Sequence, residues 1–177
     1  MNIPNFITIA RVMSVPVIFW LLVSGQTRTA FFVFLAAGAS DALDGFLAKR
    51  FDWRTELGAV LDPLADKLLL VSLFIALGVA RELPLWLVVA VVSRDILIVL
   101  AVMVSWVMSQ PVAIKPLAVS KLNTLFQIVL VATVLADSAF GLELAHVRTV
   151  LVWITGTLTL LSLAAYLRGW FRHMTGS

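Results

Sequence analysis

The chain has 177 residues, of which 62% are hydrophobic and 13% charged, and its formal net charge is +3. A mean hydropathy of +1.06 is that of a membrane protein and argues against a soluble domain of this length. Because the chain has no cysteine, disulfides are excluded, and because its basic residues are scattered, a nucleic-acid surface is not expected.

Six apolar segments follow one another along the chain, and most reach the ~20 residues that a helix needs to cross a bilayer. They cover approximately residues 12–24, 29–49, 57–80, 83–108, 117–136 and 147–167. We therefore predict an all-α fold, a single membrane domain over residues 1–177 built as a bundle of six transmembrane helices. The first segment is short and contains Pro16, so residues 3–10 either extend it or lie along the membrane surface. We expect the second arrangement, a short amino-terminal interfacial helix.

Lys and Arg near the segment ends predict the orientation, because cytoplasmic loops carry an excess of these residues. Seven lie on the side of both termini and three on the other side: Arg11, Lys49, Arg50, Arg54, Lys115, Arg168 and Arg172, against Arg28, Arg81 and Arg148. We expect both termini and the region 41–66 to face the cytoplasm. A signal peptide is not expected, because no basic residue precedes the first apolar run. Without an evident transit peptide, we expect the bacterial inner membrane; a processed mitochondrial protein is the alternative interpretation.

The amino-terminal segment carries polar side chains at helical spacing. Asn5, Thr8 and Arg11 are three residues apart, so they share one face if the segment is helical, and Pro4 suits a first helical turn. From the residues alone, this pattern is also that of an ordinary interfacial helix with a capping asparagine.

Four aspartates flank the polar link between the second and third apolar segments. Asp41 and Asp44 are three apart, and Asp62 and Asp66 are four apart, so each pair occupies one helix face. If the two helices run back antiparallel, the four carboxylates converge. Ionised carboxylates in apolar helices are costly and mark functional sites, and a divalent cation is the simplest way to hold four of them together. The spacing therefore predicts a metal site.

Small residues accompany these aspartates. Gly45 follows Asp44, Ala48 comes three residues later, and Gly58 shares a face with Asp62. Small side chains let a ligand or another backbone approach closely, which a phosphate-bearing substrate beside a metal requires. Helix capping and close packing are the alternative interpretation.

Polar residues also interrupt the fourth segment. Arg94 and Asp95 are adjacent, and adjacent residues on a helix do not face each other. We therefore expect Arg94 to have its partner elsewhere, either another carboxylate or a bound phosphate.

The start of the fifth segment is basic and polar. Lys115 and Lys121 either extend to lipid headgroups or, together with Arg94, bind the phosphate of a substrate. Because Lys121, Asn123, Thr124 and Gln127 come so close together, we expect the face that carries them to look inward.

The pattern Asp41-x2-Asp44-Gly45-x2-Ala48-Lys49-x8-Gly58-x3-Asp62-x3-Asp66 resembles the signature of the CDP-alcohol phosphatidyltransferase family. Lys49 departs from it, because the family usually has Arg there, and the bidentate fork of a guanidinium is lost. The amino-terminal run, residues 93–95 and residues 115–127 are most similar to CMP-forming cardiolipin synthases. Phosphatidylglycerophosphate synthases share the first of these features but more often carry Gly-Lys-x-Lys-Thr in place of residues 120–124.

This resemblance implies metal-dependent transfer of a phosphatidyl group from CDP-diacylglycerol to phosphatidylglycerol, giving cardiolipin and CMP. The alternative acceptor is glycerol 3-phosphate. The resemblance implies two Mg²⁺ or Mn²⁺ ions, with Asp41, Asp44, Asp62 and Asp66 as ligands and Asp66 also as the catalytic base. It further implies that the protein forms a homodimer and that membrane lipids are among its partners. The residues that it assigns to CDP-diacylglycerol are Asn5, Thr8, Gly45, Ala48, Lys49 and Gly58, and those assigned to the acceptor phosphate are Arg94, Lys115 and Lys121.

Two other classes of protein are compatible with buried acids in a helical bundle. A cation or proton transporter would carry polar residues on both sides of the midplane and broken helices in matching halves, whereas these acids gather at one edge. A lipid-binding scaffold without catalysis would need only part of the aspartate set. Both are therefore secondary to the enzyme.

Overall fold

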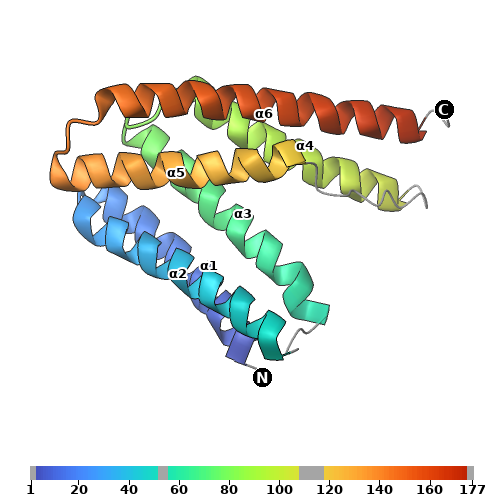
Figure 1. Cartoon of the computed structure of the whole chain (residues 1–177), viewed down its shortest axis with the longest axis horizontal. Helices are drawn as coiled ribbons and strands as arrows, with labels where there is room; N and C mark the ends of the chain where they lie inside the picture. Colours follow the sequence, from blue (N-terminus) through green and yellow to red (C-terminus); the bar gives the residue numbers. More distant parts are fainter. Residues whose placement is uncertain (1–2, 52–55, 108–117, 175–177) are drawn as a thin grey trace. The chain divides into compact units, whose positions relative to one another are not determined.

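The computed structural model describes residues 3–51, 56–107 and 118–174, and their side chains over 13–40, 67–100 and 118–170. These residues form α-helices and no strand, which confirms the all-α prediction (Figure 1). The helices, close to the six predicted segments, are α1 (Ile3–Val23), α2 (Thr27–Phe51), α3 (Glu56–Val79), α4 (Leu85–Val107), α5 (Ala118–Phe140) and α6 (Ala145–Met174).

The amino-terminal segment differs from its prediction. Residues 3–10 are not a separate interfacial helix but the first part of α1, which runs without a break through Pro16. A proline inside a helix removes one backbone hydrogen bond, but its fixed φ is compatible with helix, and here the helix continues for seven more residues, to Val23. Asn5 and Thr8 therefore lie on a long helix, near its beginning.

The chain divides into two compact units. Unit 1 comprises Met1–Glu82 and Val131–Leu144, and unit 2 comprises Leu83–Leu130 and Ala145–Ser177. Unit 1 thus contains α1, α2, α3 and the second part of α5, whereas unit 2 contains α4, the first part of α5 and α6. The single domain over residues 1–177 stays a prediction.

In unit 1, α1 packs against both α2 and α3. Ile18, Phe34, Leu73 and Phe74 are among its buried apolar side chains. The chain turns from α1 into α2 within three residues, and Gly25 adopts a φ of 74° there, a conformation that glycine takes without strain.

The end of α5 is attached to the start of α2 by an arginine and a group of aromatic rings. The Arg28 Nε donates a hydrogen bond of 2.8 Å to the carbonyl of Ala139, and its guanidinium carbon lies 5.6 Å from the centre of the Phe140 ring. Phe31 and Phe32 meet the same ring edge-on. The start of α2 and the end of α5 are therefore held together inside unit 1.

In unit 2, α4 packs against α6 through a close contact at Gly156. A Cβ atom at Gly156 would lie 2.7 Å from the Trp86 ring, so only glycine leaves room for this indole. The Trp86 ring also lies 5.4 Å from that of Trp153, centre to centre, and both rings are exposed.

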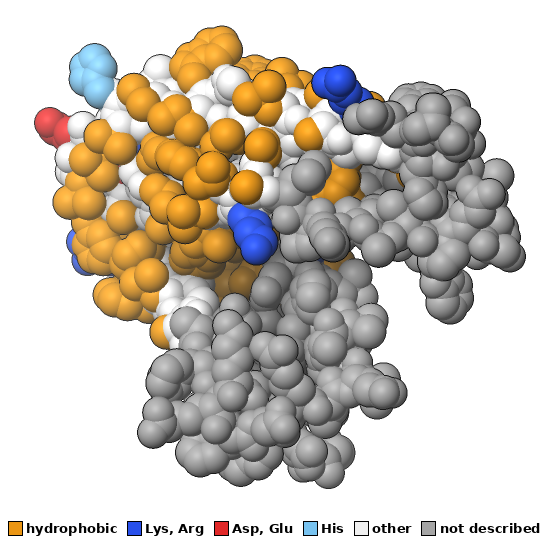
Figure 2. All heavy atoms as spheres, turned by 45° about the vertical axis from the view of Figure 1, so that its right-hand side comes forward, with side chains coloured by type: hydrophobic (Ala, Val, Ile, Leu, Met, Phe, Trp, Pro, Cys, Tyr) orange, Lys and Arg blue, Asp and Glu red, His pale blue; other side chains and the backbone are white. Residues whose placement is uncertain are grey.

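The outer surface of the described helices is apolar. Large hydrophobic side chains such as Trp20, Leu85, Val89 and Leu160 are exposed, and Figure 2 shows hydrophobic side chains over much of the visible face. Within the described residues, Ala118–Phe140 and Ala145–Trp170 are long and apolar enough to cross a membrane, and Met13–Val23 and Lys67–Val79 are shorter apolar helices. Exposed apolar faces of this kind are suited to a lipid solvent.

Candidate active site and the buried polar seam

The backbone of unit 1 places the parts of α2 and α3 that carry the signature residues at one end of the unit. Asp41 and Asp44 lie in the last part of α2, and Asp62 and Asp66 in the first part of α3. Figure 1 shows the start of α1, the end of α2 and the start of α3 at the same end of this unit. Asn5 and Thr8 are thus on the helix that packs against both aspartate helices.

The side chains of these predicted site residues lie outside the described ones, as do those of Gly45, Ala48, Lys49 and Gly58, and Lys115 lies outside the described backbone. Their convergence therefore stays a prediction. Within 13–40, 67–100 and 118–170, no three His, Cys, Asp or Glu side chains are placed to hold a metal. The four aspartates remain the candidate ligands, and a set of carboxylates is chemically suited to Mg²⁺ or Mn²⁺.

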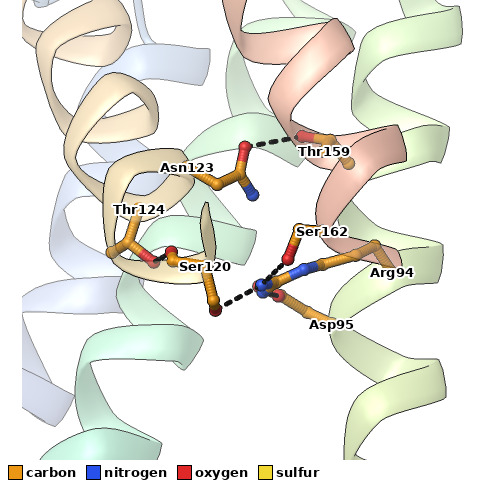
Figure 3. A network of polar contacts seen from close by, with 7 residues as sticks. All are labelled: Arg94, Asp95, Ser120, Asn123, Thr124, Thr159 and Ser162. Carbon is orange, nitrogen blue, oxygen red and sulfur yellow. Dashed lines mark hydrogen bonds and ion pairs between the residues drawn. The ribbon is translucent and has the colours of Figure 1, made fainter. Parts of the chain in front are cut away.

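Arg94 lies in the interior of unit 2, with only 1% of its surface exposed. Its Nη1 donates to Asp95 Oδ1 at 2.5 Å, and its Nη2 donates to the hydroxyls of Ser120 and Ser162, both at 2.6 Å (Figure 3). The guanidinium also lies 5.7 Å from the centre of the Tyr166 ring. One arginine on α4 thus connects α5 and α6.

The prediction that Arg94 would not pair with its neighbour Asp95 is wrong. Successive Cβ atoms on a helix diverge by about 100°, but the long arginine side chain spans that angle. Burial supplies the reason, since a guanidinium out of water needs a counter-charge and the nearest one is Asp95.

The inward-facing side of α5 is confirmed for two of its polar residues. Asn123 is fully buried and Gln127 is 1% exposed. The Thr159 hydroxyl donates to Asn123 Oδ1 at 3.0 Å. Lys121 does not share this face and is exposed, because it lies about 100° around the helix from Ser120.

The inward residues of α5 meet a matching row on α6. We call the set the polar seam; its members are Ser120, Asn123 and Gln127 on α5 and Thr155, Thr159 and Ser162 on α6. Ser120 and Ser162 share Arg94, and Asn123 bonds Thr159. The two helices run antiparallel, so four residues after Asn123 on α5 correspond to four residues before Thr159 on α6. Gln127 is therefore level with Thr155.

The α6 half of the seam was not predicted from the sequence, because no functional residue was assigned to this helix. The signal was present, because Thr155, Thr159 and Ser162 recur at spacings of four and three and therefore share one face. All three are fully buried, so the face of α6 that carries them looks into the interior of unit 2.

Residues 1–161 match the family model described as CDP-alcohol phosphatidyltransferase. The chain belongs to this family. It is similar to a cardiolipin synthase (CMP-forming) / mitochondrial hydrolase fusion protein of Schizosaccharomyces pombe, at 33% identity, covering 98% of the chain and 32% of that protein. It is also similar to human cardiolipin synthase (CMP-forming), at 34% identity, covering 79% of the chain and 52% of that protein.

Relatives whose names give glycerol 3-phosphate as the acceptor match as well. The chain is 33% identical to CDP-diacylglycerol--glycerol-3-phosphate 3-phosphatidyltransferase of Pseudomonas fluorescens, covering 98% of the chain and 92% of that protein. Among the first relatives, the chain spans from about a third to just over half of their length. Family membership confirms the resemblance found in the sequence and favours an enzyme over a transporter or a scaffold. Relatives named for either acceptor match at similar identities.

Proposed function

We propose that this phosphatidyltransferase uses phosphatidylglycerol as its acceptor and forms cardiolipin and CMP. The observation that carries the choice is the position of the half-buried Ser120, which bonds Arg94, and of the fully buried Asn123, which bonds Thr159. These two residues lie in the segment whose sequence is most similar to CMP-forming cardiolipin synthases, and both take part in the polar seam around Arg94.

In the proposed reaction, the hydroxyl oxygen of the acceptor forms a bond to the phosphorus that carries diacylglycerol. The bond from that phosphorus to CMP breaks, and CMP leaves with the electron pair. The hydroxyl proton passes to a carboxylate oxygen of Asp66, the last aspartate of the signature. General-base assistance of this kind contributes about 10²- to 10⁴-fold to a rate.

Asp41, Asp44, Asp62 and Asp66 would hold two Mg²⁺ or Mn²⁺ ions. Such ions would neutralise the pyrophosphate and the charge that develops on the transferring phosphoryl group. Metal dependence is tested by removing divalent ions with a chelator and restoring CMP release with Mg²⁺ or Mn²⁺. Restoration by neither ion would contradict it.

The donor binds beside the aspartates in this proposal. Gly45, Ala48 and Gly58 leave room for the cytidine, and Lys49 lies near the pyrophosphate. Asn5 and Thr8 reach phosphate or sugar oxygens from α1. Substituting Thr8 by Val should raise the KM for CDP-diacylglycerol without changing that for the acceptor, and an unchanged donor KM would remove Thr8 from this site.

The acceptor phosphate binds to Arg94, Lys115 and Lys121. The two described residues of this set differ in their surroundings. Arg94 is buried and paired with Asp95, whereas Lys121 is exposed. Lys121 is suited to attract an anionic headgroup from outside, and Arg94 to orient it once it is desolvated.

The membrane arrangement is part of the proposal. Six transmembrane helices, cytoplasmic termini and a cytoplasmic active site would follow from the charge asymmetry, in a bacterial inner membrane and as a homodimer. Reporters fused after Ser177 and in the loop between α5 and α6 should report opposite sides. An outside location for Ser177 would invert this topology.

Phosphatidylglycerophosphate synthesis is the second candidate, favoured by the Pseudomonas fluorescens relative, which the chain covers almost completely. The deciding experiment supplies purified protein with CDP-diacylglycerol and Mn²⁺, and offers phosphatidylglycerol and glycerol 3-phosphate in separate reactions. Cardiolipin from the first alone supports the proposal, whereas phosphatidylglycerophosphate from the second alone supports the alternative.

A further inference from the structure

Four buried side-chain atoms of the described residues have no hydrogen-bond partner, and all four lie along the polar seam or on the arginine that joins it. They are Arg94 Nε, Asn123 Nδ2, Gln127 Nε2 and Thr155 Oγ1. An unpaired polar group is costly inside any protein and more so in one surrounded by lipid, where no water is at hand to replace the partner. Four such atoms on three neighbouring helices point to a ligand.

The chemistry of these atoms identifies what the ligand must provide. Three of the four are nitrogens that only donate, and Thr155 contributes a hydroxyl that also can donate. Arg94 has five N–H groups, and only three hydrogen bonds engage them. The seam thus has a surplus of donors, which suits a ligand rich in oxygen acceptors.

The positions of these donors agree with one ligand rather than four separate defects. Figure 3 shows the Asn123 amide nitrogen turned away from Thr159 and toward the level of Ser162 and Arg94. Gln127 lies one helical turn from Asn123 and level with Thr155. The unpaired donors therefore form one row, about two helical turns long, with the guanidinium at one end.

The charge of the row limits the ligand further. Arg94 is the cation of the network and Asp95 its counter-ion, with side chains 1% and 6% exposed. The other members are neutral amides and hydroxyls, so Arg94 is the cation that the seam offers to a ligand, and Asp95 already shares its charge. A dianionic phosphate monoester would be poorly compensated here, whereas a singly charged phosphodiester with free hydroxyls matches a guanidinium followed by neutral donors.

We propose that the polar seam binds the headgroup of the acceptor lipid, a phosphodiester that carries free hydroxyl groups. Arg94 Nε meets the phosphodiester, and Asn123, Gln127 and Thr155 donate to the hydroxyl oxygens. Asn123, Gln127 and Thr155 are thereby assigned to selection of the acceptor. The assignment rests on the proposed function, because it names the part of the chain that distinguishes phosphatidylglycerol from glycerol 3-phosphate.

The test measures binding without catalysis. Purified protein in phosphatidylcholine nanodiscs, without CDP-diacylglycerol or metal, is titrated with glycerophosphoglycerol, the soluble headgroup of phosphatidylglycerol, and in parallel with glycerol 3-phosphate. We expect at least ~10-fold tighter binding of the first. Equal binding, tighter binding of glycerol 3-phosphate, or binding of neither overturns the proposal.

Two threonines of the seam form a matched pair of variants. Thr155→Val removes an unpaired hydroxyl, so it should weaken headgroup binding by ~3- to 10-fold without lowering the melting temperature. Thr159→Val removes the hydroxyl that bonds Asn123, so it should lower the melting temperature. If Thr155→Val changes the melting temperature alone, the unpaired atoms belong to the helix packing and the proposal fails.

Asn123→Asp supplies a third variant of nearly the same shape. It keeps an oxygen for Thr159 to donate to, and replaces the unpaired donor by an acceptor with negative charge. Headgroup binding should fall more than 10-fold. Because CMP release is measured separately, loss of transferase activity with headgroup binding intact would reject the proposed reaction alone, and the reverse result would reject the subsite alone.

Discussion

The two units of this chain carry polar residues of opposite kinds. In unit 1, four aspartates on α2 and α3 belong to a long and specific sequence pattern, from which a role can be predicted for each residue. In unit 2, the polar residues are one arginine, one aspartate and a row of amides and hydroxyls on α4, α5 and α6. Their hydrogen-bond partners become known only from the packing of these helices. In the proposed function, the residues of the transfer reaction therefore follow from a local pattern, whereas the residues that select the acceptor depend on helix packing.

The largest effect is expected in unit 1. Asp66→Asn keeps the shape of the side chain but cannot accept the proton, so CMP release should fall by about 10²- to 10⁴-fold. The assay is CMP release with saturating acceptor, and the control is Glu143→Gln in the α5–α6 loop, outside the signature. Substantial turnover by Asp66→Asn would assign the base to another residue.

The next effect concerns the buried pair of unit 2. Arg94→Leu leaves Asp95 buried without its cation, which should lower the free energy of unfolding by about 3–5 kcal/mol. The double variant Arg94→Leu/Asp95→Leu removes both charges and should recover a large part of that loss. Denaturant or thermal unfolding in detergent measures both, and equal loss in the two variants would mean that the hydroxyl bonds outweigh the ion pair.

Packing of unit 2 can be compared with unit 1 through two glycines. Gly156→Ala places a Cβ against the Trp86 ring and should destabilise by about 1–3 kcal/mol. Gly38→Ala lies on α2, where a Cβ meets nothing within 4 Å, so it should stabilise by up to about 1 kcal/mol. Melting temperatures in one detergent check the pair, and equal shifts would contradict the close contact at Trp86.

The smallest effect is expected at the exposed lysine of α5. Lys121→Ala should raise the KM for the acceptor by about 2- to 5-fold, with little change for CDP-diacylglycerol, because a solvated ion pair is worth no more than about 1 kcal/mol. Arg168→Ala, which removes an exposed cation from α6, serves as the control. Equal loss toward both substrates would move Lys121 to the donor site.

Much of the fold was predictable because helix length and apolar composition are local properties. The six helices lie close to the predicted segments, and the inward positions of Asn123 and Gln127 followed from their spacing. Three expectations failed for tertiary reasons. Residues 3–10 join α1, Lys121 points outward, and Arg94 pairs with Asp95 because burial demands a counter-charge where a solvated helix would not.

The sequence by itself determined the all-helical architecture, the family and the four aspartates with their small neighbours, because each depends on spacing along one or two helices. Only the tertiary structure decided that Ser120, Asn123 and Gln127 face Thr155, Thr159 and Ser162 across a buried seam. The register between α5 and α6 depends on side-chain hydrogen bonds between positions far apart in the chain, and no local pattern specifies it.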